Sequence, residues 1–268
     1  MLDLEAEVLQ DYWHDALSWI QGAADGAPRE RLLDLGAGTG AGALGLAQRF
    51  AGAEVVAVDL APESLRRLHA KALELGLASR VTGVEVDLDA GWPDLGTFDL
   101  TLASMSLHHM ADPARVLRDV LAATRPGGLI AVAEFAEPLR FLPDDPGIGS
   151  FGFEDRLIET VSAALREEMP TLGSAWAPHL TEAGWTVLEE REFNIDQNPP
   201  AHPSANRYAR AWFTRLSNAK ADSLDPQDRA TLATLLADDG ENSVLHRKDL
   251  HIRGSRTMTL AVAPGQVV

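Results

Sequence analysis

Apolar and polar residues follow two different periods along the chain, and the two periods alternate. Short apolar runs with the character of buried strands are separated by stretches in which apolar residues recur every three or four positions, as on one face of a helix. The predicted strands are 32–35, 54–59, 80–86, 98–105 and 129–135, and helices are predicted at 41–50, from Pro62 to Gly76, and from Pro113 onward. Parallel strands need crossover connections that are usually helices, so this alternation predicts an α/β fold with a parallel sheet.

The two ends of the chain are less regular. Leu9, Trp13 and Leu17 fall on one face of a helix that is predicted within 4–21. Beyond the fifth strand the predicted elements are a loop at 137–152, helices at 153–169 and around 176–183, a sixth strand at 185–195, an insertion at 198–254 with helices at 204–219 and from Asp225-Pro226 onward, and a closing strand at 256–263. The insertion is too short for a core of its own. We therefore expect a single domain, 1–268, with an N-terminal helical segment at 1–28.

The first predicted strand runs directly into a glycine-rich turn before the helix at 41–50, in the sequence Leu-Leu-Asp-Leu-Gly-Ala-Gly-Thr-Gly, residues 32–40. One carboxylate, Asp34, is followed by glycines at Gly36, Gly38 and Gly40. Glycine tolerates positive φ and, without a side chain, lets a ligand lie against the backbone. The turn is therefore predicted to hold a ligand just beyond the first strand.

This segment resembles the first motif of the class I S-adenosylmethionine-dependent methyltransferases, which have a Rossmann-like fold. The resemblance covers 30–135, through FDL at 98–100, LHH at 107–109 and RPGG at 125–128, and continues more loosely to residue 197. It implies a seven-stranded, mostly parallel sheet with helices on both faces and a closing strand antiparallel to the sixth. Two strands so related normally need only a hairpin, so we expect the insertion between them to be a helical lid over the substrate side, and 137–152 to be a substrate-side loop. The implied cofactor is S-adenosyl-L-methionine, with S-adenosyl-L-homocysteine as its product.

The resemblance assigns cofactor contacts residue by residue. Asp34 is expected beside the methionine part of the cofactor, and Asp59, 19 residues after Gly40, has close to the spacing of an acidic residue that binds ribose hydroxyls. After the third strand Asp87, or alternatively Asp89, is expected to accept a hydrogen bond from the adenine amino group. The complete set of expected cofactor-binding residues is Asp34, Gly36, Ala37, Gly38, Gly40, Asp59, Leu60, Asp87, Leu88 and Ser104.

Two adjacent histidines, His108 and His109, follow the fourth strand. Histidine titrates near neutrality, and a general base is needed only where the methyl acceptor must lose a proton. Both are predicted to be catalytic, with shaping of the cofactor loop and packing as the alternative. The expected substrate-binding residues are Tyr12, Trp13, His109, Phe135, Arg207 and Tyr208. For Tyr208 the alternative is packing of the lid helix, and for Arg207 it is a solvated basic face.

Composition restricts the partners and the chemistry. The chain has 40 acidic and 23 basic residues, a formal charge of −17, which disfavours nucleic acid as a substrate. It has no cysteine, which excludes disulfides and thiolate chemistry, and it lacks the aspartate pattern of metal-dependent methyltransferases, so no metal is expected. No apolar stretch approaches the roughly twenty residues of a membrane span, and the N-terminus has no signal-peptide pattern. A cytoplasmic monomer or homodimer is expected.

The sequence thus predicts a methyltransferase that acts on an oxygen or nitrogen nucleophile of a small molecule. Two alternatives remain open. Nicotinamide enzymes also place a glycine-rich turn after their first strand, so an NAD(P)-dependent Rossmann-type oxidoreductase is one alternative. The other is a non-catalytic protein that keeps the cofactor-binding fold, because intact cofactor residues argue for binding and not for turnover.

Overall fold

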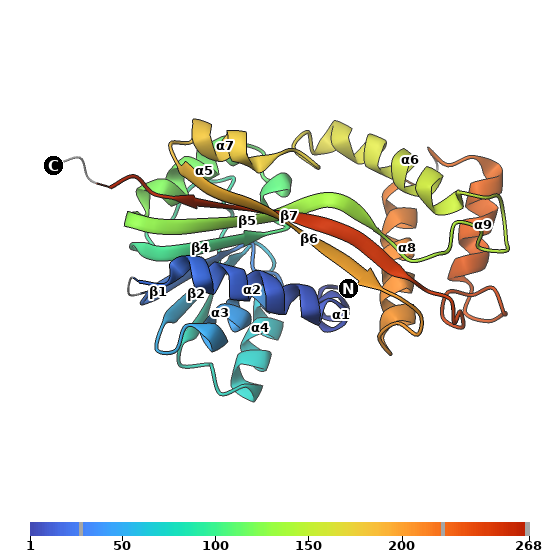
Figure 1. The fold of residues 1–268 in the computed structure, drawn as a ribbon, viewed down its shortest axis with the longest axis horizontal. Coiled ribbons are helices and arrows are strands. Elements are labelled where there is room, and N and C mark those ends of the chain that lie inside the picture. The colour runs from blue at the N-terminus through green and yellow to red at the C-terminus, as the bar shows by residue number, and fades with distance from the viewer. Residues whose placement is uncertain (27–28, 221–222, 266–268) are drawn as a thin grey trace. The chain divides into compact units, whose positions relative to one another are not determined.

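The computed structural model describes residues 1–26, 29–220 and 223–265 (Figure 1). The strands are β1 (Arg31–Leu35), β2 (Glu54–Asp59), β3 (Val81–Glu85), β4 (Phe98–Ser104), β5 (Thr124–Arg140), β6 (Thr186–Gln197) and β7 (Ile252–Val262). The helices are α1 (Leu2–Val8), α2 (Gln10–Ala24), α3 (Ala41–Arg49), α4 (Pro62–Glu74), α5 (Pro113–Ala122), α6 (Phe153–Glu168), α7 (Trp176–Glu182), α8 (Ala205–Lys220), α9 (Pro226–Leu236) and the 3₁₀ turn η1 (Leu107–His109). Within the described ranges, no helix combines the length and the apolar character that crossing a membrane would take.

The chain forms two compact units. The sheet unit comprises residues 11–135 and 173–193 and the chain from Arg256 onward, and the helical unit comprises residues 1–10, 136–172 and 194–255. The predicted loop at 137–152 and almost all of the predicted insertion at 198–254 thus fall in the helical unit. Residues 27 and 28, at the end of the predicted N-terminal helical segment, lie outside the described residues.

The seven strands form one sheet in the order β3-β2-β1-β4-β5-β7-β6. Strands β1 to β5 are parallel: Leu35 lies opposite Val58 of β2 on one side and opposite Ala103 of β4 on the other. The predicted parallel sheet is confirmed, and the carboxyl ends of these strands meet at one edge. Chain order reverses between β1 and β4, which is the place where open α/β sheets bind ligands.

The closing strand β7 lies between β5 and β6 and is antiparallel to both, as was predicted for the sixth strand. Its Ala263 end exchanges hydrogen bonds with residues 127 and 128 of β5, whereas His251, just before β7, donates to the carbonyl oxygen of Phe141. Residue numbers on β5 therefore increase as those of their partners on β7 decrease, which shows that the two strands are antiparallel. On the other side of β7, the hydroxyl of Thr259 donates to the carboxylate of Glu190 on β6, and the ring of His251 contacts the carboxylate of Asp196. These side-chain contacts show the same antiparallel order.

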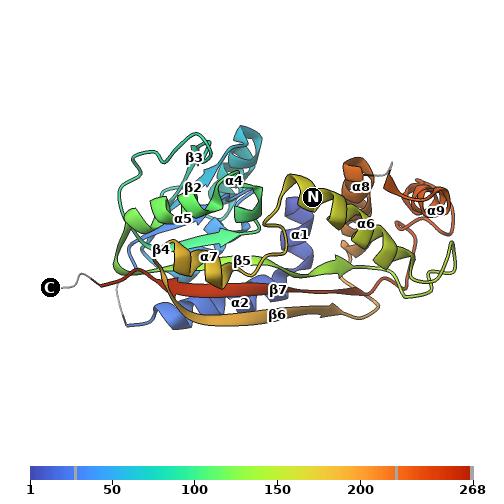
Figure 2. The same ribbon diagram turned by 90° about the horizontal axis from the view of Figure 1, so that it is seen from above.

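Helices cover both faces of the sheet unit (Figures 1 and 2). On one face, α5 and α7 pack on alternate residues of the strands, such as Leu33 and Leu35 of β1 and Val132 of β5. On the other face, α2, α3 and α4 approach closely through glycines: Gly45 of α3 lies against Leu17 of α2. Gly40, the residue before α3, lies in the same way against Leu68 of α4, so close packing fixes the start of α3 and with it the turn that leaves β1.

Two of the motifs that carry the family resemblance are joined at the amino ends of the strands. Asp99 of the FDL motif accepts the backbone N–H groups of Glu30 and Arg31 at 2.9 Å, and its other oxygen pairs with Arg125 of the RPGG motif at 2.7 Å. The carboxylate thus ties the start of β1 to β4 and β5. These motifs stabilise the sheet, whereas the predicted site lies at the opposite strand ends.

The helical unit has its own apolar core. Helix α8 contacts α1, α6 and α9, and its Tyr208 packs edge to face on Phe141 with ring centroids 5.4 Å apart. Arg156 of α6 makes a two-pronged ion pair with the buried Asp228 of α9, at 2.8 and 2.9 Å. Helices α6, α8 and α9 agree with the predicted ones.

Several element boundaries differ from the predictions, most of them by one or two residues, and strand β5 starts at Thr124 instead of 129. The single helix predicted within 4–21 is two helices, α1 and α2, which meet at Leu9. Strand β5 continues to Arg140, into the predicted loop, because it pairs with β7, which starts at Ile252 instead of 256. Pro138 reads as a strand breaker in sequence, yet proline is tolerated where no ladder hydrogen bond from its nitrogen is needed.

Candidate functional site

The glycine turn leaves β1 at the edge where the parallel strands end. Gly36, Gly38 and Gly40 have φ angles of 72°, 53° and 90°, in the left-handed region that favours glycine. A Cβ added to Gly36 would lie 2.4 Å from the Cβ of Ser106, which follows β4. The turn therefore packs tightly against the loop after β4, and only glycine fits at this position.

Asp34 lies under this turn. Its side chain is 2% exposed, and its Oδ2 has no hydrogen-bond partner among the described residues. A Cβ on Gly42 would fall 2.7 Å from that oxygen, so glycine is required on this side as well. Burial, and to a lesser extent the charge of Asp59, raise the pKa of Asp34 to about 7. The hydrogen bond from the backbone N–H of Ala43 acts in the opposite direction and lowers this pKa. A buried carboxylate with an open oxygen can bind a cationic or hydrogen-bond-donating ligand.

Asp59, at the end of β2, holds the glycine turn in place. One carboxylate oxygen accepts the backbone N–H of Gly38 at 2.7 Å, and the other accepts that of the residue two positions after Asp59, at 2.8 Å. The preceding carbonyl oxygen, of Val58, accepts the N–H groups of both Gly36 and Ala37 at 2.9 Å. The ends of β1 and β2 are thus joined into one rigid edge.

The loop after β3 continues this edge. Asp87 accepts the N–H groups of the two residues at 89 and 90, a local turn, whereas Asp89 accepts the N–H of Ala111 at 2.9 Å. Both carboxylates are exposed, so either can meet a ligand. Leu88, between the two carboxylates, is buried. Leu60, which follows Asp59 at the end of β2, is 63% exposed and offers an apolar surface.

The segment after β4 bends sharply into the same edge. Ser104 ends β4 and its Oγ is buried without a partner in the described chain. Met105 has φ of 55°, a strained value for a residue with a side chain. Ser106 then donates from Oγ to the carbonyl oxygen of Leu35 at 2.7 Å. Strain held by such anchoring is found at functional sites, and here it directs the following histidines.

The two predicted catalytic histidines lie side by side, with ring centroids 4.1 Å apart. His109 is exposed, whereas His108 is buried and its Nδ1 lies 2.5 Å from Oε2 of Glu134 on β5. The half-buried ring of Phe135 lies 5.8 Å from that of His108. Sequence reasoning missed Glu134. The signal was available, since an acidic residue interrupts the apolar run of β5 near the ligand-binding edge.

Tyr12 and Trp13 lie on α2, also in the sheet unit. The two rings meet edge to face at 5.6 Å, and the indole Nε1 of Trp13 is buried with no partner in the described chain. The guanidinium of Arg256, itself 2% exposed, lies 4.7 Å over the Tyr12 ring. Arg256 was not predicted, because only the fold brings this residue of β7 against Tyr12 of α2.

The other two predicted substrate-binding residues, Arg207 and Tyr208, belong to the helical unit. Tyr208 is fully buried in its core, and Arg207 is exposed. All the predicted cofactor residues and both histidines belong to the sheet unit. Any role of Arg207 or Tyr208 in substrate binding stays a prediction.

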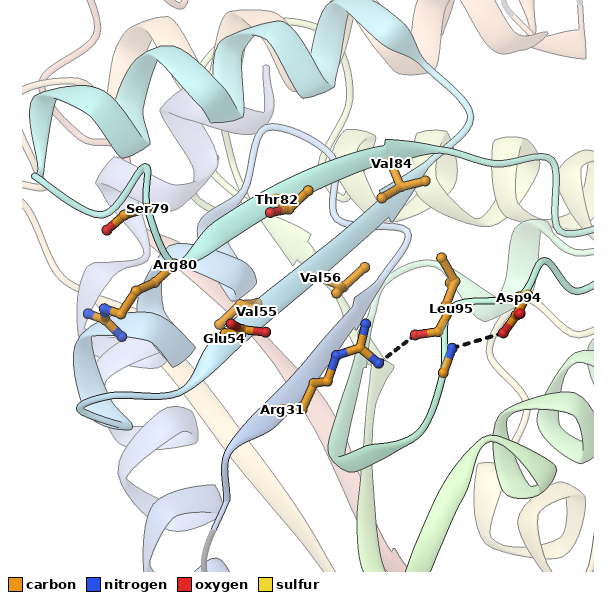
Figure 3. Close-up of a pocket in the computed structure, with 11 residues that line it drawn as sticks. Arg31, Glu54, Val55, Val56, Ser79, Arg80, Thr82, Val84, Asp94 and Leu95 are labelled. Carbon is orange, nitrogen blue, oxygen red and sulfur yellow. Dashed lines mark hydrogen bonds between the residues drawn. The ribbon is translucent and has the colours of Figure 1, made fainter.

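A groove of about 490 Å³ lies elsewhere on the sheet unit (Figure 3). It is lined by residues from the starts of β1 and β2, from β3 and from the loop before β4, such as Arg31, Val56, Thr82 and Leu95. The segment between β3 and β4 has no helix to cover this part of the sheet. Arg31 donates to the carbonyl oxygen of Leu95, so its charge is already engaged. None of the predicted site residues lines the groove.

The carboxyl edge therefore carries the chemistry. It combines a glycine turn with no room for a Cβ at Gly36 or Gly40, a buried carboxylate with an open oxygen, exposed carboxylates after β3 and a buried His–Glu pair. Such a set can hold a ligand that brings a positive charge and hydroxyl groups, and can take up a proton beside it. These are the features that binding S-adenosylmethionine requires.

Comparison with known proteins gives the same family. A family model described as a methyltransferase domain matches residues 33–130. The demethylmenaquinone methyltransferase of Thermus thermophilus is 35% identical over 166 residues, which cover 55% of this chain and 74% of that enzyme. The ubiquinone biosynthesis O-methyltransferase of Bordetella pertussis is 36% identical over 115 residues, 42% of this chain. That match spans 46% of the Bordetella enzyme, so the chain matches about half the length of this relative.

The fold has similar solved structures as well. The YcgJ protein of Bacillus subtilis superposes with a TM-score of 0.59 at 16% identity, over 94% of this chain and 99% of that one. At this identity the likeness shows the fold alone, which is the predicted Rossmann-like sheet. Together with the Thermus relative, it shows that the chain belongs to the class I S-adenosylmethionine-dependent methyltransferases.

Proposed function

We propose that this protein transfers a methyl group from S-adenosylmethionine to a hydroxyl oxygen of a small molecule. The observation that carries the proposal is Asp34, a carboxylate 2% exposed with an open oxygen under a glycine turn. An uncompensated buried carboxylate is unfavourable, so its retention at the ligand-binding edge is best explained by a ligand that supplies positive charge. S-adenosylmethionine carries that charge on its sulfonium and amino groups.

The residues of the edge divide the binding between them. Gly36 and Gly38 let the cofactor lie against the backbone, and Asp34 faces its methionine part. Asp59 keeps the turn in shape through the N–H of Gly38 and offers its carboxylate to the ribose. Asp87, with Asp89 as the alternative, accepts from the adenine amino group.

When bound, the cofactor supplies an electrophilic methyl group, so the protein contributes orientation, exclusion of water and proton transfer. A hydroxyl must lose its proton on methylation, whereas a neutral amine can attack directly. A histidine pair beside the site therefore favours an oxygen acceptor. The name of the Bordetella relative, an O-methyltransferase, supports the same choice, and the charge of −17 supports a small molecule over nucleic acid.

Calorimetric titration with S-adenosylmethionine, S-adenosylhomocysteine and NAD tests the cofactor. We expect saturable binding of the first two only, and loss of affinity in Asp59→Ala. Glu54→Ala is the matched control, since Glu54 is an exposed carboxylate at the opposite end of the same strand. Binding of NAD alone would favour the oxidoreductase alternative.

Turnover is tested by incubating the wild-type protein with S-adenosylmethionine and a panel of phenols, catechols, hydroxy acids and amines. We expect S-adenosylhomocysteine to form together with an O-methylated product, identified by mass spectrometry. Cofactor binding without methylation of any panel member would favour the non-catalytic alternative. Methylation of amines only would refute the oxygen acceptor.

A further inference from the structure

The loop after β4 is fastened by one buried carboxylate, that of Glu134 on β5. Its Oε1 accepts the backbone N–H of Leu107 at 3.1 Å, and its Oε2 lies 2.5 Å from Nδ1 of His108. The two side chains are 3% and 2% exposed. Because both oxygens are engaged, the carboxylate cannot rotate, and the imidazole of His108 is held in one orientation.

The arrangement also decides which nitrogen of His108 is basic. An ionised carboxylate has only acceptor positions, so Nδ1 carries the proton that joins it to Glu134. Nε2 then has the free lone pair and faces away from Glu134 across the ring. Holding the loop in place would need only the hydrogen bond from the backbone N–H of Leu107. The second carboxylate oxygen orients the ring of a buried histidine, and a histidine that transfers a proton needs such an orientation.

We propose that Glu134 is the positioning residue for His108 as the general base, and that the acceptor is a hydroxyl group that is un-ionised at neutral pH, such as that of a phenol; this rests on the function proposed above. A phenol with a pKa near 10 is un-ionised at neutral pH and needs a base. The acceptor O–H bond breaks and its proton passes to Nε2 of His108 as the O–CH3 bond forms. The sulfonium–methyl bond breaks at the same time, and its electron pair stays on sulfur. Glu134 keeps its contact with Nδ1 and stabilises the imidazolium.

The neighbouring ring, that of His109, is exposed and tilted by 46° against that of His108, with centroids 4.1 Å apart. Because Glu134 orients His108, the base is assigned to His108 and not to His109.

The test compares Glu134→Gln with the wild-type protein, because glutamine keeps the shape and can still accept one hydrogen bond. We expect unchanged affinity for S-adenosylmethionine by calorimetry, a KM for catechol within about threefold, and a kcat lowered about 10- to 100-fold, part of the effect of a general base. His108→Gln should lower kcat at least as much, and His109→Gln less than either.

Acceptor acidity separates positioning from a structural effect. The loss in Glu134→Gln should largely disappear with 4-nitrocatechol, whose hydroxyl ionises near neutrality and needs no base. A structural defect would lower the rates for catechol and 4-nitrocatechol equally, and that result would overturn the proposal.

A measurement without turnover completes the test. In the wild-type protein, ¹⁵N spectra of the imidazole signal that His108→Gln removes should show a protonated Nδ1 and an unprotonated Nε2 at the pH of maximal rate. A proton on Nε2 at that pH would overturn the assignment of the base. If the wild-type protein methylates no phenol or catechol but does methylate amines, both the proposed acceptor and the oxygen acceptor of the proposed function are wrong. If catechol is methylated and Glu134→Gln keeps its kcat, only the positioning role fails.

Discussion

The pKa of Asp34 predicts that cofactor binding depends on pH and releases protons. Burial first, and the charge of Asp59 second, raise this pKa to about 7 from 3.8. S-adenosylmethionine is positively charged near the sulfonium, so the ionised carboxylate should bind it and the protonated one should not. The cofactor therefore has to expel a proton from Asp34 in the fraction of molecules that carry one.

The size of the effect follows from the titration curve. With a pKa of about 7, Asp34 is roughly nine-tenths ionised at pH 8 and one-tenth ionised at pH 6. The dissociation constant should therefore rise about tenfold from pH 8 to pH 6, which is about 1.4 kcal/mol. At pH 7 about half a proton should be released for each cofactor bound.

Calorimetry measures both quantities. Titrations at pH 6, 7 and 8, each in two buffers with different ionisation enthalpies, give the dissociation constant and the number of protons released. Asp34→Asn is the matched variant: it should bind weakly at every pH and lose this contribution to proton release. If the wild-type affinity is the same at pH 6 and pH 8, or if the Asn variant keeps the slope, the reasoning about Asp34 is refuted.

The same pKa makes a second prediction, about stability without cofactor. A carboxyl whose pKa is raised on folding favours the folded state below the unfolded pKa of 3.8, and this contribution is lost as pH rises through about 7. The loss amounts to roughly 4 kcal/mol in full, about 3 kcal/mol of it between pH 5 and pH 8. Urea denaturation should therefore find Asp34→Asn more stable than wild type at pH 8, with a smaller difference at pH 5. An advantage that is larger at pH 5 would contradict this sign.

Three further predictions concern binding and folding. Asp59→Ala should weaken cofactor binding by about 1 to 3 kcal/mol, because a charged acceptor is lost; unchanged affinity in a folded variant would remove Asp59 from the ribose site. Gly36→Ala should lower the free energy of unfolding by about 2 kcal/mol more than Gly52→Ala, since both have positive φ but only the Gly36 Cβ meets a side chain, at 2.4 Å. Asp99→Ala should cost about 2 to 4 kcal/mol by urea denaturation, because two backbone N–H groups and Arg125 lose their acceptor; the exposed Asp94→Ala is the control, and equal losses would contradict this account.

Much of the sheet unit could be predicted from the sequence because its signals are local. Strand β2 was predicted with its bounds unchanged, and β1, β3, β4, α3 and α4 with small shifts at their ends. Apolar runs between glycines and prolines mark buried parallel strands well, and the positive φ values at Gly36, Gly38 and Gly40 follow from glycine itself. The carboxylates at the strand ends could be placed together because parallel strands share one edge.

What could not be predicted depends on partners distant in the chain. The extension of β5 through Pro138 to Arg140 depends on β7, more than a hundred residues later, and no local pattern announces that pairing. The contact between Glu134 and His108 depends on the bend at Met105, whose φ of 55° is unexpected for methionine. The division into two units likewise depends on contacts among residues 1–10, 136–172 and 194–255.

Buried charge marks the site in this fold better than open space does. The groove of Figure 3 is roomy, but both of its arginines, Arg31 and Arg80, already donate to backbone carbonyl oxygens, and its carboxylates are exposed. At the carboxyl edge the chain instead keeps Asp34 and Glu134 buried at 2% exposure. Apolar residues at both positions would stabilise the sheet, so keeping carboxylates there sacrifices folding stability. Each carboxylate adjoins a group that chemistry at this edge would use, the glycine turn in one case and His108 in the other, and that coincidence is the strongest physical argument that this edge is the active site.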